Sequence, residues 1–376
     1  MSLSPVRLPH PVRLPHTVLV VGAGSIGERH LRCFRETGRA DVSFVEIQEP
    51  LRSTIAARYA VRGFASLDEA LSNDLSSTTR SRVAVIATPA NSHLEIAARL
   101  ASAGWHLLIE KPLDTRLDGL APLRAAVRNS DVVVGVAYVY RCFPALVAMR
   151  GALVEGRFGR PVQLVAVCGQ NFPTYRPAYR DTYYTRHATG GGAIQDALTH
   201  VLNAGEWLVG PIDRLVADAA HRVLEGSLSA SEAAGLEPVE DTVHLLARHG
   251  HVLASYALNQ HQAPNETSIT VVCERGTVRW EAHTQRWKWM LRPDEPWREE
   301  AFEARPRDAA FIDQANRFLD AVEGECPPLC SLDEAEQTLR VSLAALESVR
   351  SGGWRTIARN DTSQSIDPPT GGAAHA

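Results

Sequence analysis

Three residues of the chain have types and spacings suited to proton transfer beside a bound nucleotide. Asp196 and His200 are four residues apart, so on a helix both side chains would lie on one face. An imidazole whose pKa lies near working pH can take a proton from an alcohol. Lys111, within Glu110-Lys111-Pro112, carries a positive charge that can stabilise a reacting oxygen. A surface Asp–His pair and a salt bridge between Lys111 and Glu110 are the competing structural interpretations.

A glycine-rich turn follows the first apolar run of the chain. Gly22-Ala23-Gly24-Ser25-Ile26-Gly27 has the GxGxxG spacing of dinucleotide-binding loops. Gly22 would permit the tight turn, Gly24 would let backbone N–H groups approach a pyrophosphate, and Gly27 would let the next helix pack closely. The start of that helix would add partial positive charge. The alternative is a structural turn that binds no ligand.

Glu46 lies about 20 residues beyond the glycines, at the end of the second predicted strand, as the dinucleotide-binding pattern requires. Its carboxylate can accept hydrogen bonds from both ribose hydroxyls of NAD, whereas the 2′-phosphate of NADP would meet a negative charge. Ile47 and Gln48 follow, and neither is an arginine that could bind this phosphate. We therefore expect NAD, with NADP less favoured. An ordinary solvated strand end is the alternative for Glu46.

The elements that must position these residues alternate between strands and helices in the first part of the chain. Repeated βα units of this kind indicate a parallel sheet with helices on both faces. The predicted strands are residues 18–21, 42–46, 83–87, 106–109 and 132–136, and the predicted helices are 25–37, 52–59, 67–71 and 93–103.

After about residue 140 the pattern changes to strands joined by hairpin turns, which predicts a mostly antiparallel sheet closed by two helices. The predicted strands are residues 162–168, 214–217, 243–246, 252–258 and 268–273, the turns are 248–251 and 274–276, and the helices are 311–322 and 332–349.

Composition limits the classes of partner. The 376 residues favour two domains of roughly 100–200 residues each. A net charge of −4 provides no field that would attract nucleic acid or an anionic membrane. The six cysteines form no CxxC pair, and Cys326 and Cys330 have no second Cys/His pair nearby, so no metal site is expected.

The two ends of the chain are expected to be flexible. Residues 1–16 repeat Pro-Val-Arg-Leu-Pro-His and lack the apolar stretch of a signal peptide, and residues 359–376 are rich in Ser, Pro, Gly and Ala. No apolar run approaches the ~20 residues that a membrane span needs. A cytoplasmic protein without membrane contact is the expectation.

Five segments in this order resemble the Gfo/Idh/MocA family of NAD(P)-dependent oxidoreductases, the glucose–fructose oxidoreductase and inositol dehydrogenase group. The resemblance implies an α/β fold, with an N-terminal Rossmann doubly wound parallel sheet at 17–137. It implies a C-terminal α+β domain at 138–358 with an open, mostly antiparallel sheet, usually within a homodimer or homotetramer. The segments are Gly22 to Gly27, Ala87 to His93, Glu110-Lys111-Pro112, Tyr138 to Pro144, and Gly190 to His200.

The resemblance also assigns catalytic roles. Lys111 would lie between nicotinamide and substrate, often beside a cis peptide bond to Pro112, where it binds the reacting oxygen. His200 would be the base, and Asp196 would hold the substrate hydroxyl or orient His200. The cofactor-binding residues would be Gly22, Gly24, Ser25, Ile26, Gly27, Glu46, Ala87, Thr88, Pro89, Asn91, His93, Glu110 and Lys111. For His93, a role at the start of a helix is the alternative.

Substrate recognition follows the family pattern less closely. Val139 stands where many members have Asn, and Phe143 replaces a frequent His, so the substrate cannot be assigned by analogy. Residues 171–186 are dense in Tyr and Arg, which suits sugar rings and anionic groups, although packing at a subunit interface explains them equally well. The candidate substrate-binding residues are Tyr138, Arg141, Tyr175, Arg176 and Arg186.

These features together predict an NAD-dependent oxidoreductase. Hydride would move between nicotinamide and a secondary alcohol or ketone of a sugar, an inositol-like polyol or a sugar acid. The direction of the reaction cannot be read from the residues. An NAD-dependent glycosidase that oxidises its sugar transiently, and a non-catalytic NAD-binding regulatory protein of the same fold, are the alternatives.

Overall fold

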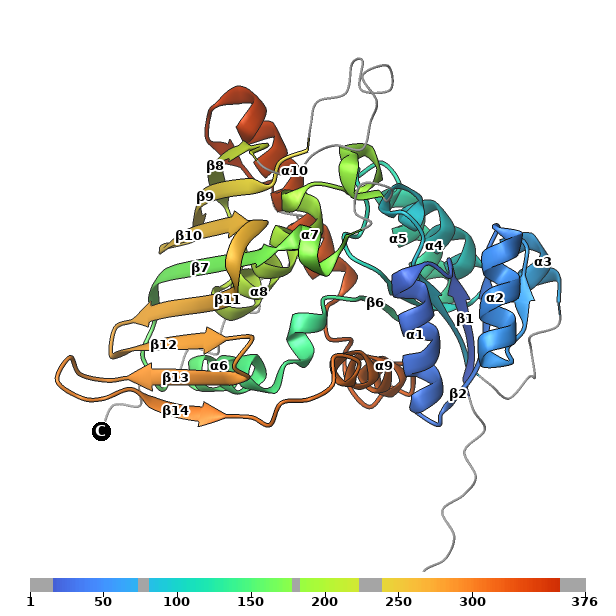
Figure 1. Ribbon diagram of the computed structural model, residues 1–376, viewed down its shortest axis with the longest axis horizontal. Coiled ribbons are helices and arrows are strands. Elements are labelled where there is room, and N and C mark those ends of the chain that lie inside the picture. Colours follow the sequence, from blue (N-terminus) through green and yellow to red (C-terminus); the bar gives the residue numbers. More distant parts are fainter. Residues whose placement is uncertain (1–15, 74–80, 178–182, 223–238, 359–376) are drawn as a thin grey trace, which may run out of the picture.

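The computed structural model describes residues 16–73, 81–177, 183–222 and 239–358, and these form two sheets of six and nine strands (Figure 1). Most of the expected leader, and the whole expected tail at 359–376, lie outside the described residues. The expected flexible leader includes one residue too many. His16 is the first residue of strand β1 and is buried.

The six-stranded sheet has the order β3-β2-β1-β4-β5-β6, and every neighbouring pair is parallel. This is the doubly wound Rossmann order, in which ligands bind at the carboxyl ends of the strands near the reversal between β1 and β4. All five predicted strands are confirmed, and β3 is an addition. The strands are β1 (His16–Val21), β2 (Ala40–Val45), β3 (Gly63–Phe64), β4 (Arg82–Ile86), β5 (His106–Ile109) and β6 (Val134–Val136).

Helices cover both faces of this sheet. Ile55 of α2 joins the core on the α1 side, while Leu67 of α3 and Leu123 of α5 join the opposite core. Helix α5 was not predicted from the sequence. The helices are α1 (Ser25–Glu36), α2 (Glu49–Tyr59), α3 (Leu67–Ser72), α4 (His93–Ser102) and α5 (Leu120–Ser130), with a short turn η1 (Ala90–Ser92).

The nine-stranded sheet has the order β14-β13-β12-β11-β7-β10-β9-β8-β15, and only the β7–β10 pair is parallel. The expected open, mostly antiparallel sheet is confirmed. The strands are β7 (Pro161–Asn171), β8 (Arg214–Ala220), β9 (Thr242–His249), β10 (Val252–Asn259), β11 (His261–Cys273), β12 (Gly276–Glu281), β13 (Arg286–Met290), β14 (Arg298–Ala301) and β15 (Arg355–Thr356).

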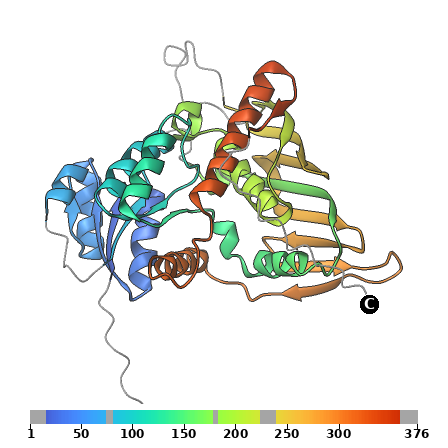
Figure 2. The same cartoon turned by 180° about the vertical axis from the view of Figure 1, so that it is seen from behind.

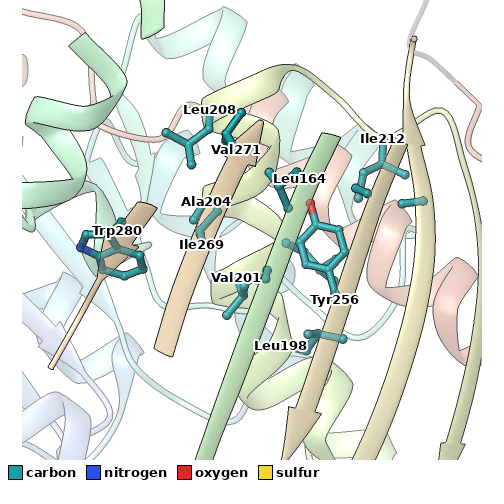
Figure 3. Close-up of a cluster of buried hydrophobic side chains, with 14 of the residues drawn as sticks. Leu164, Leu198, Val201, Ala204, Leu208, Ile212, Tyr256, Ile269, Val271 and Trp280 are labelled. Carbon is teal, nitrogen blue, oxygen red and sulfur yellow. The ribbon is translucent and has the colours of Figure 1, made fainter. Parts of the chain in front are cut away.

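One face of the second sheet is covered by helices, and the other is open (Figures 1 and 2). Figure 3 shows the covered face, where α8 packs across β7, β10 and β11 through side chains such as Leu198, Val201 and Leu164. On the open face Val165 and Leu246 remain 36% and 49% exposed. The covering helices are α6 (Pro144–Val154), α8 (Thr199–Val209) and α10 (Leu332–Ser351).

A segment that follows the strands of the second sheet returns to the first sheet. Phe318 and Leu319 of α9 (Ala309–Val322) pack in the core beside α1, and Ser331 forms a β-bridge with Gly135 of β6. Residues beyond the expected domain boundary at 137/138 therefore also pack against the first sheet. Within the described residues, no helix is both long and apolar enough to cross a membrane, and no group of three potential ligands could hold a metal ion.

Short helical segments follow β6 and lie between β7 and α8. They are η2 (Val139–Cys142), α7 (Phe172–Tyr175), η4 (Tyr183–Thr185), η5 (His187–Thr189) and a π-helix η6 (Ile194–Leu198) that leads directly into α8.

Candidate functional site

The predicted cofactor residues gather at one edge of the first sheet. Strands β1, β2, β4 and β5 end at Val21, Val45, Ile86 and Ile109, and because they are parallel these ends lie side by side. The glycine loop, Glu46, the 87–93 loop and the Glu-Lys-Pro segment each begin at the next residue. The fold therefore brings together four segments that are far apart in the sequence.

The three glycines of the loop differ in the space around the position that a Cβ atom would occupy. Gly22 has φ +89°, and a Cβ there would lie 2.9 Å from the carbonyl oxygen of Ala87. A Cβ at Gly27 would lie 1.8 Å from the Gly22 carbonyl oxygen. Gly24, the N-cap of α1, has no atom within 4 Å of its Cβ position. Packing explains Gly22 and Gly27, whereas Gly24 borders open space at a helix N-terminus that suits a phosphate.

Glu46 is buried and holds the glycine loop in place. Its Oε2 accepts a hydrogen bond from the Ala23 N–H (3.0 Å), and its Oε1 accepts one from the Gln48 N–H (2.9 Å). A carboxylate oxygen has two lone pairs, so both oxygens keep acceptor capacity for ribose hydroxyls. The next residue, Ile47, is 78% exposed and places an apolar side chain at this edge. It was not among the predicted site residues.

The loop after β4 is organised by His93, the first residue of α4. Its Nδ1 lies 3.0 Å from the Pro112 carbonyl oxygen and its Nε2 lies 2.9 Å from the Thr88 carbonyl oxygen. The side chain is buried, and burial lowers its pKa despite these two contacts. His93 thus ties two loops together, and the structure favours the helix-start alternative over direct cofactor contact. Thr88, Pro89 and Asn91 retain exposed surface.

Glu110 anchors the segment that carries Lys111. Its buried carboxylate lies 2.7 Å from His30 Nε2 and accepts a hydrogen bond from the Lys111 backbone N–H (3.0 Å). Burial opposes ionisation of Glu110, but the His30 contact together with the nearby basic side chains of Lys111 and His200 reverses this, and the pKa is lowered. The Lys111–Pro112 peptide is cis, as the family resemblance implied. Glu110 therefore orients the lysine, and its partner His30 was not predicted from the sequence.

Lys111 and Asp196 meet across the two parts of the molecule. Lys111 Nζ donates to Asp196 Oδ1 (2.8 Å) and to the Asp196 carbonyl oxygen (2.9 Å). Their side chains are only 15% and 13% exposed. Burial raises the pKa of Asp196, but the charge of Lys111 and hydrogen bonds reverse this and lower it overall. The result is an ionised pair that keeps partial access to solvent.

His200 lies beside this pair in an aromatic setting. Its ring stacks on Tyr140 (5.0 Å between centroids) and meets the edge of Tyr138 (6.0 Å). Among the described residues, its Nδ1 is buried without a hydrogen-bond partner. Burial and the charge of Lys111 lower the pKa of His200 to about 3. The expected pKa near working pH is wrong for this structure, because the sequence did not show that the imidazole is desolvated next to a cation.

The relationship between Asp196 and His200 also differs from the simple helical pair. Asp196 lies in the π-helix η6, and His200 lies in the first turn of α8. The Asp196 carboxylate is hydrogen-bonded to Lys111 and to the Tyr183 hydroxyl, and in the described part of the chain it makes no hydrogen bond to His200. Tyr183 was not among the predicted site residues. No spacing pattern in the sequence identifies it.

Two predicted substrate-binding residues are part of the core. The Tyr138 side chain is 1% exposed, and its hydroxyl lies 3.0 Å from Thr199 Oγ1. Arg141 is 2% exposed and donates to the side chains of Asn203 and Glu334 and to the Leu329 carbonyl oxygen. The structure contradicts a direct substrate contact for both. Tyr175, Arg176 and Arg186 are exposed.

Family models match both parts of the chain. Residues 16–138 match the model described as oxidoreductase family, NAD-binding Rossmann fold, and residues 146–279 match that of the GFO/IDH/MocA C-terminal domain. Together the two matches span more than half of the chain.

Curated relatives are similar mainly over part of their length. Levoglucosan dehydrogenase of Pseudarthrobacter phenanthrenivorans is 30% identical over 154 residues, which is 41% of this chain and 40% of that protein. Inositol 2-dehydrogenase of Rhizobium meliloti is 25% identical over 191 residues, which is 51% of this chain and 54% of that protein. The chain thus matches about half the length of these relatives.

Solved structures match the fold over nearly the whole chain. Levoglucosan dehydrogenase in complex with NADH and levoglucosan has a TM-score of 0.81 at 19% identity, covering 92% of this chain and 100% of that one. The WlbA dehydrogenase from Bordetella pertussis in complex with NADH and UDP-GlcNAcA has a TM-score of 0.77 at 23% identity, covering 93% and 100%. The chain therefore belongs to the Gfo/Idh/MocA family of oxidoreductases, and its first sheet is an NAD-binding Rossmann domain.

Proposed function

We propose that this protein is an NAD-dependent dehydrogenase or reductase whose substrate is a sugar, an inositol-like polyol or a sugar acid. The observation that supports this best is the Lys111–Asp196 pair, which joins residues 85 positions apart at the carboxyl edge of the first sheet. The glycine loop and Glu46 lie at the same edge. A charged pair suited to holding a hydroxyl group thus lies beside the dinucleotide site.

Lys111 and Asp196 would have different roles in the interconversion of an alcohol and a ketone. Bound NAD supplies or accepts the hydride at its nicotinamide ring. The Lys111 ammonium would bind the substrate oxygen and stabilise the negative charge that develops there. Asp196 would accept a hydrogen bond from a substrate hydroxyl through Oδ2, since its Oδ1 is engaged by Lys111 and Tyr183.

His200 is neutral near pH 7, and a neutral imidazole has a lone pair that can accept the alcohol proton. Burial and Lys111 oppose its protonation, while the nearby carboxylates of Asp196 and Glu110 favour it. Proton transfer to His200 therefore requires that Lys111 lower the pKa of the alcohol at the same time. The lysine and the histidine would act as a unit.

The substrate class rests on weaker observations than the reaction class. The relatives named above act on cyclic polyols or anhydrosugars according to their names, and the WlbA structure contains a nucleotide-linked sugar acid. Exposed Tyr175, Arg176 and Arg186 could contact a sugar ring or an anionic group. The structure contains no observation that favours a transient-oxidation glycosidase or a non-catalytic regulator.

We also propose that the open face of the second sheet mediates a homodimer or homotetramer. Leu246, Ser255 and Val165 are register partners across β9, β10 and β7, so two exposed aliphatic side chains flank a small residue in one row. An exposed apolar patch of this kind is typical of an interface. Leu246→Asp should reduce the assembly in sedimentation experiments without unfolding the chain.

The test is NADH formation across a panel of sugars, inositols and sugar acids, with the reverse reaction measured on the corresponding ketones. Lys111→Ala and His200→Ala should abolish turnover while NAD binding, measured by calorimetry, persists. Lys288→Ala is the matched control, because Lys288 is the chain's only other lysine and lies on β13. If NAD binds but no substrate reacts in either direction, the proposed function is wrong.

A further inference from the structure

Tyr183 is a part of the site to which neither the sequence nor the family resemblance assigned a role. It is the first residue of η4, and its side chain is 46% exposed. Its hydroxyl donates a hydrogen bond to Asp196 Oδ1 over 2.7 Å. This phenol contacts the carboxylate that we propose binds the substrate. It can therefore influence the orientation of that carboxylate.

In the part of the chain that the structure describes, hydrogen bonds reach one oxygen of the Asp196 carboxylate. Oδ1 accepts hydrogen bonds from Tyr183 (2.7 Å) and from Lys111 Nζ (2.8 Å). Among the described residues, no protein donor reaches Oδ2. Two donors on one oxygen restrict rotation of the carboxylate, so Oδ2 is held in one direction as the acceptor that remains for a ligand.

The backbone around Tyr183 is itself held to the glycine segment before Asp196. The Tyr183 carbonyl oxygen accepts from Thr189 Oγ1 (2.8 Å), and the Tyr184 carbonyl oxygen accepts from the Gly192 N–H (3.0 Å). A Cβ at Gly191 would lie 2.2 Å from that same Tyr184 oxygen. The position of the phenol is therefore coupled to the segment that carries Asp196.

Tyr183 acts as a hydrogen-bond donor and is unsuited to act as a base. Although the residue is partly exposed, desolvation of the phenol and the negative charge of Asp196 raise its pKa well above the ordinary value for tyrosine. The phenol stays protonated near neutral pH, so the donated hydrogen bond is present throughout the working range. In return, this hydrogen bond favours the ionised form of Asp196.

We propose that Tyr183 is a positioning residue of the oxidoreductase site, whose hydroxyl fixes the Asp196 carboxylate so that Oδ2 faces the substrate. This role rests on the proposed function. It predicts that removing the hydroxyl while keeping the ring impairs use of the substrate more than binding of NAD.

Kinetics of Tyr183→Phe test the role directly. We expect kcat/KM to fall roughly 10- to 100-fold, the effect of losing one hydrogen bond to a charged group. The acid limb of its pH profile should move to higher pH, because Asp196 loses a donor that favours ionisation. Tyr59→Phe is the matched control, since it also removes a phenol–carboxylate hydrogen bond, to Glu28 (2.6 Å), at residues with no role in the proposed site, and it should change neither quantity. Unchanged kinetics in Tyr183→Phe would overturn the proposal.

A second readout does not need turnover. The chain contains two lysines, Lys111 and Lys288, so lysine labelled with ¹³C at the ε carbon gives two NMR signals, which Lys288→Arg assigns. Lys111 contacts Asp196, and its signal should therefore report protonation of that carboxylate on acidification. We expect the midpoint to rise in Tyr183→Phe and to stay unchanged in Tyr59→Phe.

The two readouts separate this inference from the proposed function. If the wild type oxidises or reduces no substrate, the proposed function fails, while the NMR midpoint still decides whether Tyr183 controls Asp196. If the wild type is active and neither the midpoint nor the kinetics respond to Tyr183→Phe, only the role of Tyr183 is wrong. Calorimetric NAD binding confirms that each variant remains folded.

Discussion

His30 Nε2 of helix α1 lies 2.7 Å from the buried Glu110 carboxylate, which in turn accepts the backbone N–H of Lys111. Helix α1 begins at the glycine loop. This contact therefore links the backbone that would bind the pyrophosphate to the residue that would bind the reacting oxygen. The distance between the two sites depends on a buried pair of which the Glu-Lys-Pro motif contains only Glu110.

Breaking this link should cost stability. Glu110→Ala leaves the His30 ring buried without its partner, and we expect the free energy of unfolding to fall by ~1–3 kcal/mol. Urea denaturation measures it. Glu274→Ala is the control, because Glu274 pairs with Arg160 at the surface and such pairs contribute about 0–1 kcal/mol. Equal losses in the two variants would contradict an anchoring role for Glu110.

Two glycines of the loop should respond differently to alanine. Gly27→Ala places a Cβ against the Gly22 carbonyl oxygen and should destabilise the fold, seen as a lower Tm. Gly24→Ala meets no protein atom and has an ordinary backbone conformation (φ −62°), so its Tm should be unchanged. Its added methyl group should nevertheless weaken NAD binding in calorimetry, since this position faces the predicted pyrophosphate site. Unchanged NAD affinity in Gly24→Ala would argue against that placement.

The two lysines allow a labelling experiment with an internal control. The side chains of Lys111 and Lys288 are 15% and 18% exposed, and each is paired with a carboxylate. We expect NAD together with a substrate analogue to slow modification of Lys111 by an amine-reactive reagent severalfold, as measured by peptide mass spectrometry. Modification of Lys288 should not change. Protection of both lysines, or of neither, would be inconsistent with Lys111 facing the ligand site.

Glu206 should make stability depend on pH. Burial raises its pKa to about 7, although Thr338, Gln337 and the Ile212 N–H donate hydrogen bonds to it. Because the folded pKa lies above the unfolded one, this stabilisation is complete below about pH 4.5 and is lost as pH rises through about 7. We expect a loss of ~1–3 kcal/mol between pH 5 and pH 8. In Glu206→Gln the urea midpoint should lose this part of its pH dependence, and parallel curves for both proteins would refute the assignment.

Much of the fold could be predicted from local sequence. Uninterrupted apolar runs such as Val83 to Ile86 mark strands that are buried on both faces, and the structure confirms them. Helices α5 and α6 were missed. Each of these helices has a proline in its first turn, Pro122 in α5 and Pro144 in α6. Proline is tolerated at that position, so it does not exclude a helix.

The candidate site also has features that the sequence predicts and features that it does not. The glycine spacing and Glu46 after the second strand follow from the dinucleotide-binding motif, because each depends on local backbone geometry. The cis bond at Pro112 agrees with what the family resemblance implies. Tyr138 and Arg141 were wrong as substrate contacts, because a motif does not show which way its side chains point in the packed structure. Local spacing likewise could not reveal that the His200 imidazole is desolvated beside the Lys111 cation.

By itself, the sequence determined the family, the two kinds of sheet and the segments from which the site is built, since these depend on periodicity and turn chemistry over a few residues. Only the tertiary structure decided that Lys111 and Tyr183 share one oxygen of Asp196 and that His30 supports Glu110. Contacts between distant residues depend on how the two sheets and their helices pack. That packing is set by burial of the whole apolar core rather than by any local pattern.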